Sequence, residues 1–268
     1  MLLNIKSNFI LKVLFENLKY KRKLKIVKYN KKILERLNIT TEKYKACEIL
    51  KGFNEKYKMD IKDVDIEKLS LSNITIPKEE LESLLKLELK HLKQLVLTWN
   101  PKFDINILKI ARCEKLNKLY LNGNGISNID ILEDVNFKEL KILSFSSNNL
   151  NNIDVFENVN FTKLEILNIR NNNISDINVF ERVYFKELKE LHLNKNQISD
   201  INVFEKVKFK KLRFLELSEN KISNIDVFSR VKFENLEYLF LENNLINIEL
   251  NLQLINKLKS KLKNFIYK

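Results

Sequence analysis

Apolar positions recur along this chain with a fixed period of 24 residues. In each copy of the repeat, the third and fifth residues after an opening leucine are also apolar, as Leu191 and Leu193 are after Leu188. Apolar residues that alternate with a period of two predict a short strand with one buried face. A unit of this length cannot bury that face by itself, so the period predicts a stacked array of units. The opening leucines, called position 0 below, are Leu92, Leu116, Leu140, Leu164, Leu188, Leu212 and Leu236.

Asparagine occupies position 8 of every copy, where the chain must turn away from the strand. The turn leaves backbone groups inside the stack that need hydrogen-bond partners. An asparagine amide both donates and accepts hydrogen bonds, so a stack of them can satisfy these groups. The pattern therefore predicts a buried ladder formed by Asn100, Asn124, Asn148, Asn172, Asn196, Asn220 and Asn244.

The second half of each copy has the spacing of a short helix. Position 14 is Asp or Asn and position 17 is usually Glu, which predicts helix-capping boxes. The pairs are Asp130 with Glu133, Asp154 with Glu157, Asn178 with Glu181, and Asn202 with Glu205. A phenylalanine closes the unit and is predicted to lie in the core, at Phe137, Phe161, Phe185, Phe209 and Phe233.

The pattern L-x-x-L-x-L-x-x-N-x-I resembles the leucine-rich-repeat family over most of Ile66 to Ile248. The resemblance implies an α/β solenoid, with a curved parallel sheet inside and short helices outside. The expected domains are a helical segment at 1–60, the solenoid at 61–249 and a capping segment at 250–268. The capping segment is amphipathic, with Leu254, Ile255, Leu258 and Leu262 at helical spacing.

The amino-terminal segment lacks the repeat, and its apolar spacing predicts three helices. It resembles a divergent F-box through Ile10, Leu11, Leu14, Phe15, Leu18, Leu24, Val27 and Lys31. That resemblance implies docking on a Skp1-type adaptor of a cullin ubiquitin ligase, with a substrate held by the repeats. The alternative is a helical cap of the solenoid.

The net charge of +13 is unevenly distributed along the chain. Residues 1–60 hold 16 Lys/Arg and 6 Asp/Glu, whereas residues 61–248 hold 27 Lys/Arg and 28 Asp/Glu, so the array is close to neutral. A neutral array disfavours tracking of a nucleic-acid backbone along its face. Binding of nucleic acid or an acidic surface through residues 1–60 is a third functional alternative, and nucleic acid is not the expected partner.

Positions 2, 4, 6 and 7 are predicted to face the concave side of the sheet, which is the expected binding surface for a protein partner. The aromatic residues near the carboxyl end are flanked by acids, which predicts a partner with an apolar anchor and basic residues. The candidate partner-binding residues are Trp99, Tyr120, Arg170, His192, Phe214, Glu216, Glu219, Tyr238, Phe240 and Glu242.

No combination of residues predicts catalysis, a metal or a cofactor. The two histidines, His91 and His192, lack metal-ligand spacing. Two cysteines, Cys47 and Cys113, cannot build a disulfide framework, and Cys113 occupies the position of a core phenylalanine. The sequence shows no membrane span or clear secretory signal. We therefore expect a non-catalytic protein-binding module inside the cell, in the cytoplasm.

Overall fold

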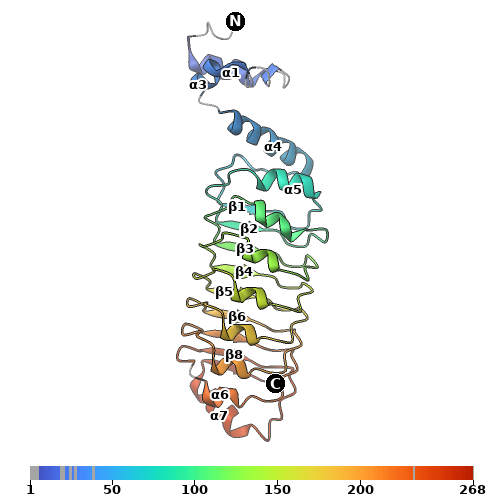
Figure 1. Cartoon of the computed structure of the whole chain (residues 1–268), viewed down its shortest axis with the longest axis vertical. Coiled ribbons are helices and arrows are strands. Elements are labelled where there is room, and N and C mark those ends of the chain that lie inside the picture. Colours follow the sequence, from blue (N-terminus) through green and yellow to red (C-terminus); the bar gives the residue numbers. More distant parts are fainter. Residues whose placement is uncertain are drawn as a thin grey trace. The chain divides into compact units, whose positions relative to one another are not determined.

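Short strands from successive repeats pair side by side into one parallel sheet. The computed structural model describes residues 6–18, 22–23, 26, 29–37, 40–231 and 233–267. Its contacts divide the chain into two compact units, Met1–Val64 and Asp65–Lys268. Within the described residues, the second unit holds nine strands in chain order (Figure 1). They are β1 (Lys68–Ser70), β2 (Gln94–Val96), β3 (Lys118–Tyr120), β4 (Ile142–Ser144), β5 (Ile166–Asn168), β6 (Glu190–His192), β7 (Phe214–Glu216), β8 (Tyr238–Phe240) and β9 (Asn264–Ile266).

The pairing register equals the sequence period, so equivalent residues of neighbouring repeats stand side by side. Leu119 of β3 is paired with Leu143 of β4, and Leu143 is paired with Leu167 of β5. These leucines at position 3 are fully buried. Burying a leucine side chain contributes about 1.5–3 kcal/mol. The row of leucines is therefore the main apolar core of the array, as the period predicts, and the solenoid fold is confirmed.

The asparagine ladder is also confirmed. The Asn172 Nδ2 donates to the backbone oxygens of Phe145, in the preceding repeat, and Ile169, in its own repeat, both at 3.0 Å. Its Oδ1 accepts the backbone N–H of Leu150 at 3.0 Å. One side chain thus satisfies backbone groups of two repeats. In the first repeat, Ile74 replaces the asparagine, and its N–H donates to Asn100 Oδ1 at 3.2 Å.

The residue before each asparagine has a left-handed backbone conformation, which the sequence pattern did not reveal. Position 7 has a φ between 53° and 68° in every repeat, at Trp99, Gly123, Ser147, Asn171, Lys195, Glu219 and Asn243. For a residue other than glycine this conformation costs on the order of 1 kcal/mol. The asparagine that follows fixes the turn with several hydrogen bonds, so the array tolerates this strain.

Single helical turns form the side opposite the sheet. They are η2 (Ile105–Ile110), η3 (Asp130–Glu133), η4 (Asp154–Glu157), η5 (Asn178–Glu181), η6 (Asn202–Glu205) and α6 (Val227–Arg230). The predicted capping boxes, Asp130 with Glu133 and its counterparts, are wrong. The acceptor lies at position 12 instead; the Oδ1 of Asn152, for example, accepts the Asp154 N–H at 2.7 Å. At the start of each turn, a backbone N–H thus donates a hydrogen bond to the side chain two residues earlier in the chain. The same bond is made by Asp104, Asn128, Asp176, Asp200 and Asn224.

Three of the four glutamates at position 17 pair instead with cations of the next repeat, whereas Glu133 accepts a hydrogen bond from Asn158 at 2.7 Å. Glu157 lies 2.5 Å from Arg182, Glu181 lies 3.0 Å from Lys206, and Glu205 pairs with Arg230. Since these pairs are solvent-exposed, each contributes between 0 and about 1 kcal/mol. Their consequence is that charges of the array are neutralised between repeats.

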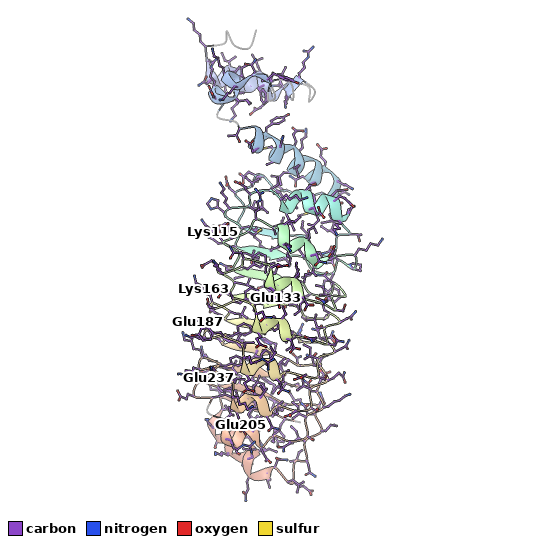
Figure 2. The ribbon with its side chains drawn as sticks, in the orientation of Figure 1. Lys115, Glu133, Lys163, Glu187, Glu205 and Glu237 are labelled. Atoms are coloured by element: carbon purple, nitrogen blue, oxygen red, sulfur yellow. The ribbon has the colours of Figure 1, made fainter. Side chains whose placement is uncertain are left out.

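A second set of ion pairs joins the residues at position 1 of neighbouring repeats. Glu165 lies between Lys141, at 3.0 Å, and Lys189, at 2.5 Å. Hydrogen bonds from these two lysines lower the pKa of Glu165. Glu237, also at position 1, pairs with Arg213, and the residues just before position 1 pair as well, as Lys163 does with Glu139 and Glu187 with Lys211. Lys163, Glu187 and Glu237 lie along one flank of the array (Figure 2). The near-zero charge of the repeats therefore reflects matched pairs.

The ends of the array depart from the repeat. At the start, Pro77 precedes α5 (Lys78–Leu85), in line with the helix-like spacing there. At the other end, α7 (Leu252–Lys261) buries Ile255 and Leu258. The sequence predicted an amphipathic cap at 250–268; the structure ends its helix at Lys261 and adds β9, which pairs with β8. The sheet therefore extends one strand beyond the last asparagine.

The amino-terminal unit contains α1 (Asn8–Glu16), α3 (Lys31–Leu37) and α4 (Thr41–Tyr57). Phe15, Leu34 and Tyr44 form its buried cluster. Leu24 and Val27, which belong to the F-box resemblance, lie outside the described residues. Among the helices that the structure describes, no helix has the length and apolarity needed to cross a membrane.

Candidate functional site on the concave face

The strand residues at positions 2 and 4 point to the face of the sheet opposite the leucines of position 3. The pairing aligns position 4 from repeat to repeat, so Asn168 is beside His192, His192 is beside Glu216, and Glu216 is beside Phe240. We call this surface the concave face. All ten candidate residues belong to the strands of this face or to the turns that follow them.

Four rings gather at the carboxyl end of the concave face, with Phe214 at their centre. The Phe214 ring centroid lies 4.8 Å from that of His192, 5.2 Å from Phe240 and 6.1 Å from Tyr238. The sequence predicted an exposed cluster, but these rings are half-buried because they cover each other. His192 belongs to this group of rings, which we call the aromatic cluster.

Two carboxylates border the aromatic cluster and share one serine. The Ser218 N–H donates to Glu216 Oε1 at 3.1 Å, and the Ser218 hydroxyl donates to Glu242. Burial raises the pKa of Glu216, and the nearby charges of Glu242 and Glu219 add to this effect. Burial and the neighbouring acids therefore destabilise the ionised form of Glu216, and a cation beside it would stabilise that form.

The middle of the concave face carries opposite charges. The exposed Arg170 is anchored by its Nε, which donates to Ser146 Oγ at 3.0 Å. Burial lowers the pKa of His192, although Glu190 lies 3.4 Å from its Nε2 and acts in the other direction. Exposed Glu219 pairs with Lys195 at 3.3 Å. The surface is therefore cationic at Arg170 and anionic beyond His192.

Trp99 and Tyr120 are not brought to the aromatic cluster, because strands β4 and β5 lie between them and His192 of β6. Trp99 is 54% exposed, and its ring lies across Gly123 of the next repeat. A Cβ at Gly123 would come within 2.3 Å of that ring, so glycine is required there for this contact, whereas other repeats hold the same positive φ without glycine. Burial raises the pKa of the half-buried Tyr120. These two residues lie near the start of the sheet, apart from the aromatic cluster.

Ser218, Glu190 and Asn194 also lie in this part of the concave face but are not among the candidate residues. The 24-residue register would have revealed them, because it places Ser218 between the two acidic positions and Glu190 beside Phe214. Two of the ring contacts that build the site join different concave positions of neighbouring repeats: Phe214 at position 2 contacts His192 and Phe240 at position 4.

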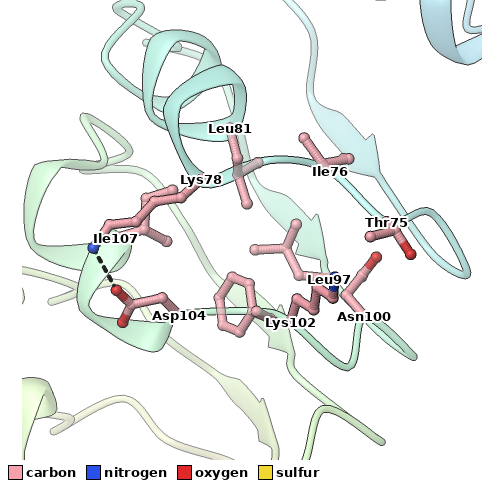
Figure 3. A pocket seen from close by; sticks show the side chains of 10 residues that line it. Thr75, Ile76, Lys78, Leu81, Leu97, Asn100, Lys102, Asp104 and Ile107 are labelled. Carbon is pink, nitrogen blue, oxygen red and sulfur yellow. Dashed lines mark hydrogen bonds and ion pairs between the residues drawn. The ribbon is translucent and has the colours of Figure 1, made fainter.

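A small cavity lies between α5 and η2, where the side chains do not fill all the space (Figure 3). It is enclosed by side chains that include Ile76, Leu81, Leu97 and Ile107, and has a volume of about 20 Å³. That is room for about one water molecule. An ion pair between Lys78 and Asp104, 2.7 Å long, lies at its side. The cavity is too small for a ligand.

The buried thiol of Cys113 is not a reactive group. Burial raises the pKa of Cys113 to about 12, so this thiol is protonated at neutral pH. In the described part of the chain, no group of three His, Cys, Asp or Glu side chains is placed to hold a metal ion. Cys113 lies in the core, as its position in the repeat predicts.

Comparisons with known proteins identify the repeat. A family model described as leucine-rich repeats (2 copies) matches residues 162–206 and 186–230. Internalin C2 from Listeria monocytogenes is 22% identical, with 76% of this chain and 85% of that chain covered and a TM-score of 0.57. No curated protein sequence matches the chain.

Two further solved structures are similar at lower TM-scores. A leucine-rich-repeat protein from Leptospira interrogans is 20% identical over 74% of this chain and 59% of its own, with a TM-score of 0.48. The plant peptide hormone receptor RGFR1 in complex with RGF2 is 18% identical over 69% of this chain and 37% of its own, with a TM-score of 0.47. Residues 162–230 thus match the leucine-rich-repeat model, and the 24-residue register and asparagine ladder give the whole array the fold of a leucine-rich-repeat solenoid.

Proposed function

We propose that the chain is a non-catalytic module that binds a protein partner on its concave face. The observation that carries this proposal is the aromatic cluster around Phe214. Aromatic side chains beside charged groups are typical anchors of protein interfaces. Neighbouring strands are about 4.8 Å apart, so the nine strands span roughly 40 Å. An extended segment of a partner fits such a surface better than a small molecule.

Replacing Phe214, Tyr238 and Phe240 together by alanine should abolish partner capture. The variant removes three rings from the surface and retains the buried leucines beneath them, so the array should stay folded. Capture is measured by quantitative mass spectrometry of proteins retained from a lysate of the source cells. Circular dichroism and thermal unfolding check the fold of the variant.

The matched control is Tyr184→Ala, which removes a 53% exposed ring from the connection between η5 and β6. Proteins that both wild type and the control retain, and that the triple variant loses, are the concave-face partners. If a folded triple variant retains the same proteins as wild type, the concave-face proposal is wrong.

A second function is favoured by α1, which carries apolar side chains on two faces. Leu11 and Phe15 are buried, whereas Phe9, Ile10, Val13 and Leu14 are exposed. We propose that this exposed face docks a Skp1-type adaptor, which is the role that the F-box resemblance implies. Ile10 and Leu14 are two of the residues that carry that resemblance and also lie on the exposed face.

Replacing Ile10 and Leu14 by serine should lower the affinity for a purified Skp1-type adaptor at least tenfold, because two apolar contacts are lost. Binding is measured by calorimetry, and Lys12→Ser on the same helix is the control for a change of surface polarity. If wild type shows no adaptor binding, this second function fails. Nucleic acid that is retained in low salt and lost on deletion of residues 1–60 would support the basic-segment alternative instead.

A further inference from the structure

We propose that the carboxyl-terminal part of the concave face holds one arginine side chain of the partner. The site, called the arginine site below, is formed by Phe214, Glu216, Ser218, Phe240 and Glu242. This inference rests on the proposed function, since it names the chemistry that the concave face recognises. Three observations of the structure carry it.

The first observation is that the two carboxylates lack the cationic partners that several other glutamates of the array have in a neighbouring repeat. Glu165 is bonded by two lysines and Glu237 by Arg213 and Lys263. In contrast, Glu216 and Glu242 accept hydrogen bonds from Ser218, and the described residues offer neither of them a cationic partner within 4.0 Å. Both are half-buried, so solvent screens their charge less than it screens the flank pairs.

The second observation is the position of the rings relative to the charge. Glu216 is paired in register with His192 on one side and Phe240 on the other. The Phe214 and Phe240 centroids are 5.2 Å apart with the ring planes tilted by 41°. A guanidinium group stacks on aromatic faces while its edge donates to carboxylates. Rings and carboxylates on neighbouring strands provide both kinds of contact together.

The third observation is an acceptor without a donor in the same part of the face. Backbone bonds from Leu193 N–H to Glu216 O, 2.8 Å, and from Lys195 N–H to Ser218 O, 2.9 Å, hold Asn194 beside Ser218. The Asn194 Oδ1 is buried, and no described group donates to it. An unsatisfied acceptor costs about 1–3 kcal/mol. The arginine site and its surroundings therefore hold more hydrogen-bond acceptors than donors.

Arginine fits this set better than lysine. Its planar guanidinium carries five N–H donors in a fixed fork, whereas an ammonium carries three and stays strongly hydrated. The carboxylates of Glu216 and Glu242 are held on either side of Ser218, which suits a fork that bonds two acceptors at once.

The test uses N-acetyl-L-arginine amide as the probe and N-acetyl-L-citrulline amide as its neutral counterpart of nearly the same shape. Both are titrated into the full chain and followed by NMR, with signals of Phe214, Phe240 and Ser218 as reporters. Arginine amide should bind in the millimolar range and at least tenfold more tightly than citrulline amide. Glu216→Gln with Glu242→Gln should lower arginine binding at least tenfold.

The matched control is Glu187→Gln, which removes a carboxylate from the flank, where it pairs with Lys211 at 2.7 Å. This variant should bind arginine amide like wild type. Equal binding of arginine and citrulline amides, or unchanged binding by the double glutamine variant, would overturn the arginine site. N-acetyl-L-lysine amide that binds as tightly as the arginine probe would also overturn it. None of these results affects partner capture that depends on the aromatic cluster, so failure of the arginine site and failure of the proposed function are distinguishable.

Discussion

Replacing Asn172 by alanine should lower the free energy of unfolding by about 3–5 kcal/mol. The side chain is buried and bonds the backbone oxygens of Phe145 and Ile169 and the N–H of Leu150. Alanine leaves the Leu150 N–H inside the array without an acceptor, which costs about 1–3 kcal/mol. The oxygens of Phe145 and Ile169 keep their bonds from Asn148 and Asn196, so each loses one hydrogen bond, at about 1 kcal/mol. Urea-induced unfolding followed by circular dichroism measures the loss.

Asn173→Ala is the matched control, because Asn173 is the next residue and its side chain is exposed. A surface substitution of this kind should change the free energy of unfolding by no more than about 0.5 kcal/mol. If Asn172→Ala costs less than 1 kcal/mol, the ladder is not a main source of stability. Because a repeat array can unfold in parts, the unfolding transition should also broaden in the Asn172 variant.

Replacing Phe180 by alanine should cost about 3–5 kcal/mol, the range for truncation of a buried phenylalanine. Phe180 is fully buried and contacts Phe209 of the next repeat edge-to-face, with centroids 5.8 Å apart. The same contact joins Phe156 to Phe185 and Phe204 to Phe233. The substitution therefore opens a cavity between two repeats.

Phe180→Leu is the conservative control and should cost less than about 1.5 kcal/mol, because leucine refills most of the volume. Chemical denaturation of both variants gives the comparison. Equal losses for alanine and leucine would show that the ring contact with Phe209, and not the filled volume, is what stabilises this junction.

The parts of the fold that depend on periodic burial could be predicted from the sequence. Leu143 and Asn148 recur in every repeat because each must meet its equivalent in the next, and a fixed period reports such contacts directly. The capping boxes failed for a related reason. Glu157 also recurs, but it recurs because Arg182 of the next repeat bonds it. Recurrence shows that a position is constrained and leaves open which contact constrains it.

The candidate site was less predictable, because it depends on contacts that occur once. The diagonal approach of His192 to Phe214 is local, and so are the bonds of Ser218 to Glu216 of its own repeat and to Glu242 of the next one; other repeats have different residues there. The left-handed turn at Trp99 or Glu219 likewise has no consistent residue type to report it. The ninth strand lies outside the repeat and was missed for that reason.

The ion pairs between neighbouring repeats have a consequence for how such an array can change in length. Removing residues 164–187 would preserve the 24-residue spacing of the buried leucines. It would also remove Glu165, and Lys141 and Lys189 would then stand at equivalent positions of adjacent repeats, as two like charges without a carboxylate between them. The apolar core residues are equivalent in all repeats, so the core would accept the repeats in another order. The charges on the flank match only the repeat that is the present neighbour, so they favour the existing order.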